Sequence, residues 1–497
     1  MTLTDKPIAP LARTDRFFIG GEWVAPSSDS MIDVYDSDTE DLYFRIAEAQ
    51  APDMARAVAA AREAFDTGPW PRMTPAERAE VLQALGDAIG ARGGDVAEIW
   101  PRESGVIQAI AQSTAAFATW YFHQTAAQAA TYPFERVVPP SFGGEFGLVV
   151  REPVGVVGAI VPWNSPLGCI AAKVAPALLA GCTVVLKSSP EAPGEGYLVA
   201  EAAEAVGLPP GVLNVVTADR EVSERLVTDP RVDKIAFTGS TAVGRRIATI
   251  LGDRIGRYTL ELGGKSAAVV FDDADIGVAA ATLAGAECFL SGQVCSSLTR
   301  IIVPRSRHDE MAEALAAAFS QVRVGSPFDP ESHMGPLASA RQRDRVEGFI
   351  AKGVAEGATL ATGGGRPQDR ERGYYIEPTV FAGVDNGSTI AREEIFGPVL
   401  SVIPADDEEH AIELANDTIY GLNASVFTAD VDRARAAASR LRSGTVGHNG
   451  MYTDFGMSFG GFKQSGVGRE GLYDGLDAFV ESKSIILAGR PEGHPEA

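Results

Sequence analysis

Apolar and polar positions follow two alternating periods in the middle of the chain. After Val154, short apolar runs such as GVVGAIVP, TVVLKSS, VLNVVTA and KIAFTGS alternate with segments of helical spacing such as KVAPALLAG and GYLVAEAAEAVG. This alternation predicts a parallel sheet covered by helices, with a ligand crevice beyond the carboxyl ends of its strands. A second α/β stretch begins near YTLELGGKSAAVVFDDAD and continues to about Val446. We therefore expect an α/β protein with two such domains.

The flanking segments have different patterns. Residues 51–130 are rich in Ala with charges at helical spacing, and Pro52 and Pro75 stand near expected helix starts, so this region is predicted to be mainly helical. The next stretch, TYPFERVVPPSFGGEFGLVVREP, favours hairpin strands because of its aromatic and β-branched residues. The last apolar segment, ESKSIILAG, predicts a strand that pairs with this hairpin or with another subunit.

Composition excludes several functional classes. The 497 residues carry a formal net charge of −23, which repels phosphate backbones and anionic lipid, so we expect no nucleic-acid or membrane partner. Asp5, Lys6 and Pro7 interrupt any secretory signal, and the first 18 residues are interpreted as a short mobile arm. No CxxC pair supports a metal site or a disulfide framework, which favours a reducing cytoplasm; the four cysteines are Cys169, Cys182, Cys288 and Cys295.

Two glycine motifs and one cysteine are candidates for chemistry. FTGSTAVGRR places Gly239 between a predicted strand and a helix, which suits an anion or a dinucleotide, although the GxGxxG spacing is missing. LELGGKSA ends like a phosphate-binding loop, but Thr259 replaces its first glycine, which excludes a P-loop ATPase. Cys295 has small and polar neighbours in FLSGQVCSSLTR, unlike a buried structural thiol, so it is a candidate nucleophile. The other three cysteines are interpreted as packing residues.

Seven motifs occur together and in one order: VPWNSP, LKSSP, FTGSTAVG, LELGGKS, GQVC, EEIFGPVL and FGGFKQSGVGRE. Jointly they resemble the NAD(P)-dependent aldehyde dehydrogenase superfamily over about Phe17 to Leu487. The resemblance implies two Rossmann-like α/β domains and a small β bridging element. It assigns residues 1–130 and 150–258 to an NAD(P)-binding domain, 259–446 to a catalytic domain, and 131–149 and 475–490 to bridging strands. It also implies a homodimer or a homotetramer.

The resemblance supplies catalytic roles. Cys295 would attack the aldehyde as a thiolate, and the amide of Asn164 would join the Cys295 backbone N–H in stabilising the oxyanion. Glu261 would be the general base that activates water against the thioester, with a pKa raised by apolar neighbours in TLELGG. Lys173 would support a proton path near Glu261.

The same resemblance implies a set of cofactor contacts. Pro190 stands where many family members carry an acid, and Glu191 follows it, which leaves NADP as an alternative cofactor. NAD is preferred because SSPEAPGEG contains no Arg or Lys to attract the 2′-phosphate. The expected cofactor residues are Ile160, Pro162, Trp163, Lys187, Ser189, Pro190, Gly239, Ser240, Val243, Leu262, Gln342, Glu394 and Phe396.

Small residues after Asn164 predict a wide substrate tunnel with apolar walls, which favours bulky hydrophobic or aromatic aldehydes. The expected tunnel residues are Ser165, Gly168, Cys169, Ala172, Phe289, Leu290, Met457 and Phe459. Two alternative enzymes are a semialdehyde dehydrogenase and a coenzyme A-acylating relative, which typically lacks the glutamate that Glu261 supplies. A third alternative is a non-catalytic protein on the same fold, which the intact Cys295, Glu261 and Asn164 disfavour.

Overall fold

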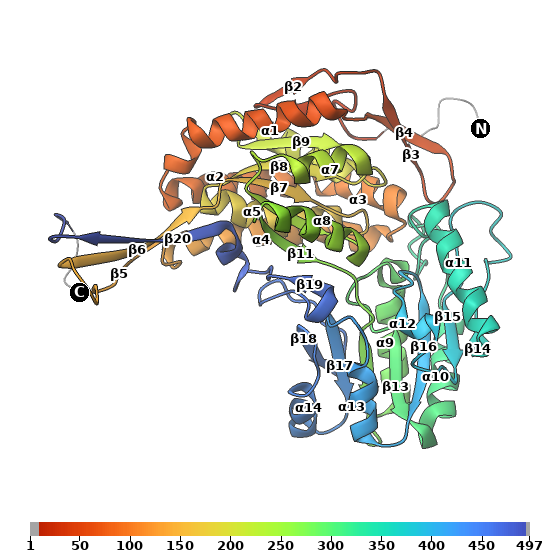
Figure 1. Cartoon of the computed structure of the whole chain (residues 1–497). Coiled ribbons are helices and arrows are strands. Elements are labelled where there is room, and N and C mark those ends of the chain that lie inside the picture. The colour runs from red at the N-terminus through yellow and green to blue at the C-terminus, as the bar shows by residue number, and fades with distance from the viewer. Residues whose placement is uncertain (1–8, 494–497) are drawn as a thin grey trace.

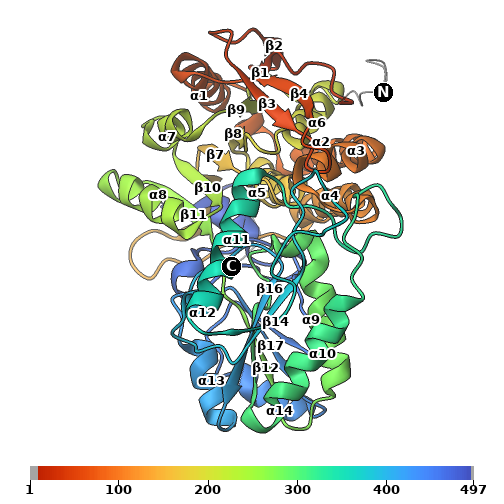
Figure 2. The same cartoon turned by 90° about the vertical axis from the view of Figure 1, so that its right-hand side faces the viewer.

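Two open sheets form two lobes of the protein (Figures 1 and 2). The computed structural model describes residues 9–493, so the first eight residues of the expected N-terminal arm lie outside the described part. Within residues 9–493 no helix combines the length and the apolar character needed to cross a membrane.

The first sheet has the strand order β19-β11-β10-β7-β8-β9-β1-β2, and its five central strands are parallel. These strands are almost continuously apolar because helices cover both faces. Val157 and Val184 contact the core under α2, α4, α5 and α6, whereas their neighbours Val156 and Val185 face α1, α7 and α8. The strands are β1 (Phe17–Ile19), β2 (Glu22–Val24), β7 (Val156–Ile160), β8 (Thr183–Ser188), β9 (Leu213–Thr217), β10 (Lys234–Thr238), β11 (Arg257–Glu261) and β19 (Gly466–Val467).

The helical region expected between residues 51 and 130 is present. Thr74 begins one of its helices with a capping box, since its hydroxyl accepts from the Glu77 N–H while Glu77 reaches back to the Thr74 N–H. The helices of this lobe are α1 (Ala51–Asp66), α2 (Pro75–Gly90), α3 (Gly93–Ser104), α4 (Gln108–Ala127), α5 (Pro166–Ala180), α6 (Gly194–Ala205), α7 (Arg220–Thr228) and α8 (Thr241–Asp253), and the strands β3 (Met31–Tyr35) and β4 (Leu42–Ala47) pair separately.

The second sheet has the order β14-β15-β16-β13-β12-β17-β18, and all its pairs except β14·β15 are parallel. Its strands are β12 (Ala267–Val270), β13 (Arg300–Pro304), β14 (Thr359–Thr362), β15 (Thr379–Ala382), β16 (Val399–Ala405), β17 (Asn423–Phe427) and β18 (Thr445–His448). Its helices are α9 (Ile276–Cys288), α10 (His308–Ser320), α11 (Ala340–Ala355), α12 (Thr389–Arg392), α13 (Glu408–Asn416) and α14 (Val431–Ala438). The boundary expected between residues 258 and 259 falls inside β11, which stays in the first sheet because it pairs with β10 along its whole length.

A third, small sheet projects from the first lobe in Figure 1. It contains β5 (Glu135–Val137), β6 (Phe146–Pro153) and β20 (Val480–Leu487). The ESKSIILAG strand therefore pairs with the hairpin of its own chain, and all eight residues of β20 align with β6. The division into cofactor-binding, catalytic and bridging parts stays a prediction.

Candidate active site

A cavity of about 1110 Å³ lies where the two lobes meet. The first lobe lines it with residues that directly follow or end its parallel strands, namely Pro162 to Asn164 after β7, Thr238 to Ser240 at β10, and Glu261 to Gly263 at β11. This is the carboxyl edge at which open α/β sheets bind ligands. The second lobe contributes the Cys295 turn, the start of α11, and loops around residues 394–396 and 451–459.

The cavity brings together most of the predicted site residues. Those that line it are Asn164, Glu261, Cys295, Pro162, Trp163, Gly239, Ser240, Leu262, Gln342, Glu394, Phe396, Ser165, Gly168, Cys169, Phe289, Leu290 and Phe459. Those outside its lining are Lys173, Ile160, Lys187, Ser189, Pro190, Val243, Ala172 and Met457. Ala172 is buried in the α5 packing surface, and Met457 points to solvent with 65% of its surface exposed. The structure thus gives these two no place in the tunnel wall.

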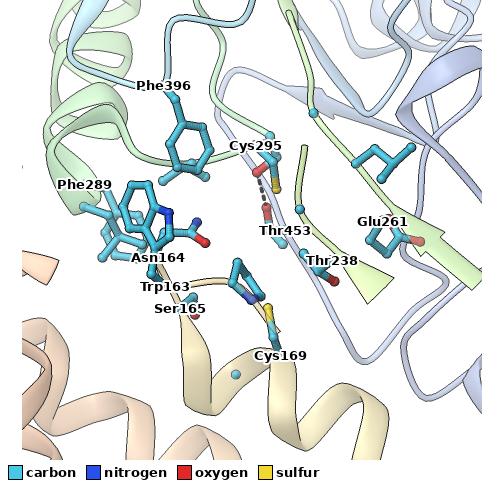
Figure 3. A pocket seen from close by; sticks show the side chains of 18 of the residues that line it. Trp163, Asn164, Ser165, Cys169, Thr238, Glu261, Phe289, Cys295, Phe396 and Thr453 are labelled. Carbon is cyan, nitrogen blue, oxygen red and sulfur yellow. Dashed lines mark hydrogen bonds between the residues drawn. The ribbon is translucent and has the colours of Figure 1, made fainter. Parts of the chain in front are cut away.

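Cys295 follows a strained turn and faces the cavity (Figure 3). Leu290 and Ser291 have φ angles of 50° and 56°, and Gly292 continues the left-handed run with 72°. A side chain at Gly292 would clash with the Gly397 backbone, so glycine is required there on two grounds. Burial raises the pKa of the Cys295 thiol, and the nearby Glu394, Cys169 and Glu261 raise it further. The thiol is therefore protonated at neutral pH and would have to lose a proton before it could act as a nucleophile.

Asn164 lies on the loop between β7 and α5, and in Figure 3 it and Glu261 flank Cys295. Its side-chain Nδ2 donates to the backbone carbonyl of Gln293 over 2.8 Å. An amide nitrogen carries two hydrogens, so one N–H is held by the protein and the other is available to a ligand.

Glu261 ends β11 and is only 3% exposed. Among the described residues neither of its carboxyl oxygens has a hydrogen-bond partner. Burial raises the pKa of Glu261 well above its usual range, Glu470 raises it further, and Lys173 lowers it. The carboxyl is therefore suited to accept a proton near neutral pH.

Lys173 and Glu470 form a buried ion pair beside Glu261. The Lys173 ammonium donates to Glu470 Oε1 and to Thr238 Oγ1, each over 2.5 Å. Burial alone would lower the pKa of Lys173, but Glu470 raises it above its ordinary value, so this lysine stays charged. Sequence reasoning missed Glu470 and Thr238 as site residues, although FGGFKQSGVGRE and FTGSTAVG contain them.

Two glycines of LELGGK hold Glu394 in the cavity wall. The Gly264 N–H donates to Glu394 Oε1 over 3.0 Å, and a Cβ atom at Gly263 would clash with this carboxyl group. Burial raises the pKa of Glu394 to about 7. Gln342 donates to the Phe396 carbonyl, and the Phe396 ring contacts Trp163 edge-on at 5.4 Å, which joins the lobes here.

The first lobe has features that fit a dinucleotide. Gly239 and Ser240 line the cavity at the N-terminus of the 13-residue helix α8, where unpaired backbone N–H groups favour an anion. A side chain at Gly239 would collide with the Phe237 ring, so no side chain separates the backbone there from a ligand. Lys187 ends the parallel pairing of β7 with β8, and its ammonium has no hydrogen-bond partner among residues 9–493. Burial lowers the pKa of Lys187 to about 8.

The fold adds a cation to this region that the local sequence lacks. The segment SSPEAPGEG contains no cation, but α11 brings Arg341 into an ion pair with Glu191. Arg341 and Arg220 both line the cavity. The local sequence could not show this, because the two arginines come from other elements.

The remaining wall of the cavity is apolar and aromatic. Phe117 from α4 contacts Phe455 at 5.9 Å between ring centroids, and Phe455 contacts Phe459 at 4.6 Å. The hydroxyls of Ser113 and Ser296 already bond within the protein, to the Ile110 carbonyl and to Thr453. Residues that sequence reasoning did not single out here are Trp100, Ile110, Phe117, Val294, Met451 and Phe455.

Comparison with known proteins now decides the family. The pattern of the aldehyde dehydrogenase family matches residues 23–485, almost the whole chain. The chain belongs to the aldehyde dehydrogenase family. The resemblance drawn from the seven motifs is thereby confirmed, as is the α/β aldehyde dehydrogenase fold.

Relatives of this aldehyde dehydrogenase include enzymes for several aldehydes. Geranial dehydrogenase of Castellaniella defragrans is 44% identical, covering 95% of this chain and 98% of the relative. A Pseudomonas 3-succinoylsemialdehyde-pyridine dehydrogenase is 42% identical over the same shares of the two chains. A Mycobacterium tuberculosis aldehyde dehydrogenase solved with NAD+ is 43% identical with a TM-score of 0.93, covering 97% of this chain and 99% of that one. A mutant Pseudomonas syringae aldehyde dehydrogenase C, solved with NAD+ and octanal, is 39% identical with the same TM-score, covering 99% and 100%.

The raised thiol pKa predicts slow alkylation of Cys295. Labelling by iodoacetamide should still accelerate between pH 8 and pH 10, because the thiolate fraction grows with pH up to the raised pKa. Glu394→Gln removes a negative neighbour and should speed labelling at pH 9 about threefold, as a fall of half a pKa unit would. Mass spectrometry of the Cys295 peptide measures the rate, and the exposed Glu393→Gln is the control. A wild-type rate that is constant above pH 7 would contradict the protonated thiol.

Proposed function

We propose that this aldehyde dehydrogenase oxidises its substrate to the carboxylic acid with NAD, through a covalent thioester on Cys295. The observation that carries the proposal is the joint placement of Cys295, Asn164 and Glu261 around one cavity beside a dinucleotide-fitting helix terminus. Relatives solved with NAD+ support the cofactor.

The first step forms a carbon–sulfur bond. The Cys295 thiol releases its proton to solvent and the sulfur attacks the carbonyl carbon, whose π electrons move to the oxygen and make it an oxyanion. The free N–H of Asn164 and the backbone N–H of Cys295 donate to this oxygen, each contributing about 3 kcal/mol to the transition state. Bound NAD supplies the acceptor for the hydride that leaves the same carbon, and the sulfur adduct becomes a thioester.

The second step hydrolyses the thioester. Glu261 takes a proton from water as the water oxygen attacks the thioester carbon; the carbon–sulfur bond breaks, the acid leaves, and Cys295 recovers its proton. The Lys173–Glu470 pair lies beside Glu261 and offers the proton that Glu261 takes from water a route away from the site. This use of Glu261 favours water over coenzyme A as the acyl acceptor. The same residue argues against a non-catalytic role for the fold.

Two substitutions separate the steps. Cys295→Ala should abolish aldehyde-dependent NADH formation, because no covalent adduct can form. Glu261→Gln should give a burst of NADH close to one per active site and then a steady rate lowered about 100-fold or more, because acylation proceeds while hydrolysis stalls. Stopped-flow absorbance measures both phases. Turnover by Cys295→Ala would refute the covalent route, and loss of the burst in Glu261→Gln would show that Glu261 also activates the thiol.

We infer that the preferred substrates are bulky hydrophobic or aromatic aldehydes. The wall formed by Phe117, Phe455 and Phe459 carries no charge and offers rings that pack against an apolar tail. Of the arginines that line the cavity, Arg341 pairs with Glu191 and Arg345 donates to the Glu394 and Ile395 carbonyls. The geranial and octanal named for two relatives are consistent with this chemistry, whereas a semialdehyde would need a cation that this wall lacks.

A panel of aldehydes tests the substrate class. Octanal and cinnamaldehyde should exceed acetaldehyde and succinic semialdehyde in kcat/KM by about tenfold or more, because each buried methylene adds binding free energy. Phe117→Ala should lower kcat/KM for octanal more than for acetaldehyde. The matched control is Trp120→Ala, which removes a ring that contacts Phe117 but does not line the cavity. A preference for succinic semialdehyde would favour the alternative enzyme.

We also infer that NAD is preferred and NADP is accepted more weakly. Arg341 and Glu191 place a cation and a carboxylate next to each other near the proposed ribose site, so a 2′-phosphate there would be attracted by one and repelled by the other. NAD should give the higher kcat/KM in initial-rate measurements. Arg341→Ala should lower kcat/KM for NADP about tenfold and that for NAD less than twofold, whereas the exposed Lys352→Ala on the same helix should change neither. A higher kcat/KM with NADP would overturn the preference.

The small sheet suggests how copies assemble. Phe142 and Ile486 expose 92% and 59% of their surfaces on the projecting β5–β6–β20 element, which is an unfavourable arrangement for an isolated chain. We infer that residues 131–149 and 475–490 bridge subunits of a homodimer or homotetramer. The free state of the four cysteines is consistent with a cytoplasmic setting.

A further inference from the structure

Gln293 stands two residues before the proposed nucleophile and is 1% exposed. Its side-chain Nε2 donates to the Ser104 carbonyl over 3.2 Å and to the Leu290 carbonyl over 3.1 Å. Its Oε1 accepts from the Ala338 N–H over 2.9 Å. The side chain is therefore fully engaged within the protein and has no group left for a ligand.

The backbone of Gln293 makes the contact that matters for chemistry. Its carbonyl oxygen accepts from Asn164 Nδ2, the same amide whose other N–H is proposed to stabilise the oxyanion. The angle between the two hydrogens of an amide nitrogen is fixed, so the position of this carbonyl sets the direction of the free N–H. The peptide of Gln293 has to be held still for that direction to be reproducible.

The local chain would not hold this peptide by itself. Leu290 and Ser291 are non-glycine residues in the left-handed region, which L-residues avoid. The Gln293 side chain anchors this turn from both lobes, because Ser104 ends α3 of the first lobe and Ala338 precedes α11 of the second. Ser104 also donates through its hydroxyl to the Trp163 carbonyl over 2.6 Å, directly before Asn164. The Gln293 side chain and Asn164 are thus connected through the hydrogen bonds of Ser104.

We propose that Gln293 is a positioning residue that acts through Asn164: its side chain holds its own carbonyl where that carbonyl directs the oxyanion-binding N–H. The proposal rests on the proposed function, since it assumes that Asn164 stabilises the oxyanion. Gln293 itself touches neither aldehyde nor cofactor. Its loss should therefore slow the chemical steps without weakening cofactor binding.

The chain offers a matched control in Asn214, which is fully buried in the first sheet. Its amide nitrogen also donates to two carbonyls, Val184 at 3.2 Å and Gly211 at 2.8 Å, and its oxygen also accepts from one N–H, that of Gly20. Asn214→Leu and Gln293→Leu therefore each leave two buried backbone carbonyls and one backbone N–H without their side-chain partner. Only the second substitution lies beside the active site.

The test is a double-mutant cycle with octanal and NAD. Gln293→Leu should lower kcat about 100-fold, as misplacement by about 1 Å does, with the NAD dissociation constant and the iodoacetamide labelling rate of Cys295 within twofold of wild type. Asn214→Leu should lower Tm by a similar amount and leave kcat within twofold. Asn164→Ala should lower kcat about 100-fold to 1000-fold, and adding Gln293→Leu should reduce it by no more than about threefold further.

The possible outcomes distinguish failure of the positioning role of Gln293 from failure of the oxyanion role of Asn164. If the two effects multiply in the double variant, or if Gln293→Leu keeps wild-type kcat while Asn164→Ala does not, Gln293 does not act through Asn164. If Asn164→Ala itself has wild-type kcat, the proposed oxyanion role fails and the inference falls with it. Should Gln293→Leu not fold, Gln293→Asn keeps an amide one methylene shorter and enters the same cycle.

Discussion

Desolvation of ionisable groups in one cavity sets the chemistry of this protein. Burial is the largest influence on Cys295, Glu261 and Glu394, and it raises the pKa of each. The result is a desolvated site in which the thiol is protonated and the two carboxyl groups titrate at a higher pH than they would in water. A desolvated site admits an apolar aldehyde, and it strengthens the charge interactions inside it. The protonated thiol would have to be activated within the cavity before it could act as the proposed nucleophile.

The charged pair Lys173–Glu470 acts on Glu261 rather than on the thiol. Lys173 and Glu470 are both deeply buried, yet each is matched by the other and Lys173 also bonds Thr238. A buried ion pair of this kind is weak evidence for stability, because desolvation of two charges offsets most of their attraction. Its position next to Glu261 gives it a different use. Lys173 holds the pKa of Glu261 below the value that burial and Glu470 would otherwise produce, which keeps that group within reach as a base.

The site also depends on contact between the two lobes. Cys295 and Glu394 come from the second lobe, whereas Asn164, Glu261 and the helix terminus at Ser240 come from the first. Hydrogen bonds of Gln293 and the Trp163–Phe396 ring contact cross this junction. The reacting groups can therefore be aligned only when both lobes are folded and docked.

The sequence by itself determined the strands, the main helices, the family and the chemical groups. Short continuous apolar runs such as TVVLK, bounded by turn residues, indicate buried strands, and GQVC and LELGGK contain the proposed nucleophile and the proposed base. Prediction was less successful for residues whose role depends on neighbours from distant elements. Met457 has the composition of a tunnel residue but points to solvent, Phe117 and Phe455 form the wall instead, and Arg341 reaches Glu191 from a helix 150 positions away. The role of Glu470 could not be predicted either, because nothing in its glycine-rich loop indicates the ion pair that it forms with Lys173. Tertiary structure alone decided these points, because burial, pKa and contact are properties of distance in space, whereas periodicity and short motifs record only distance along the chain.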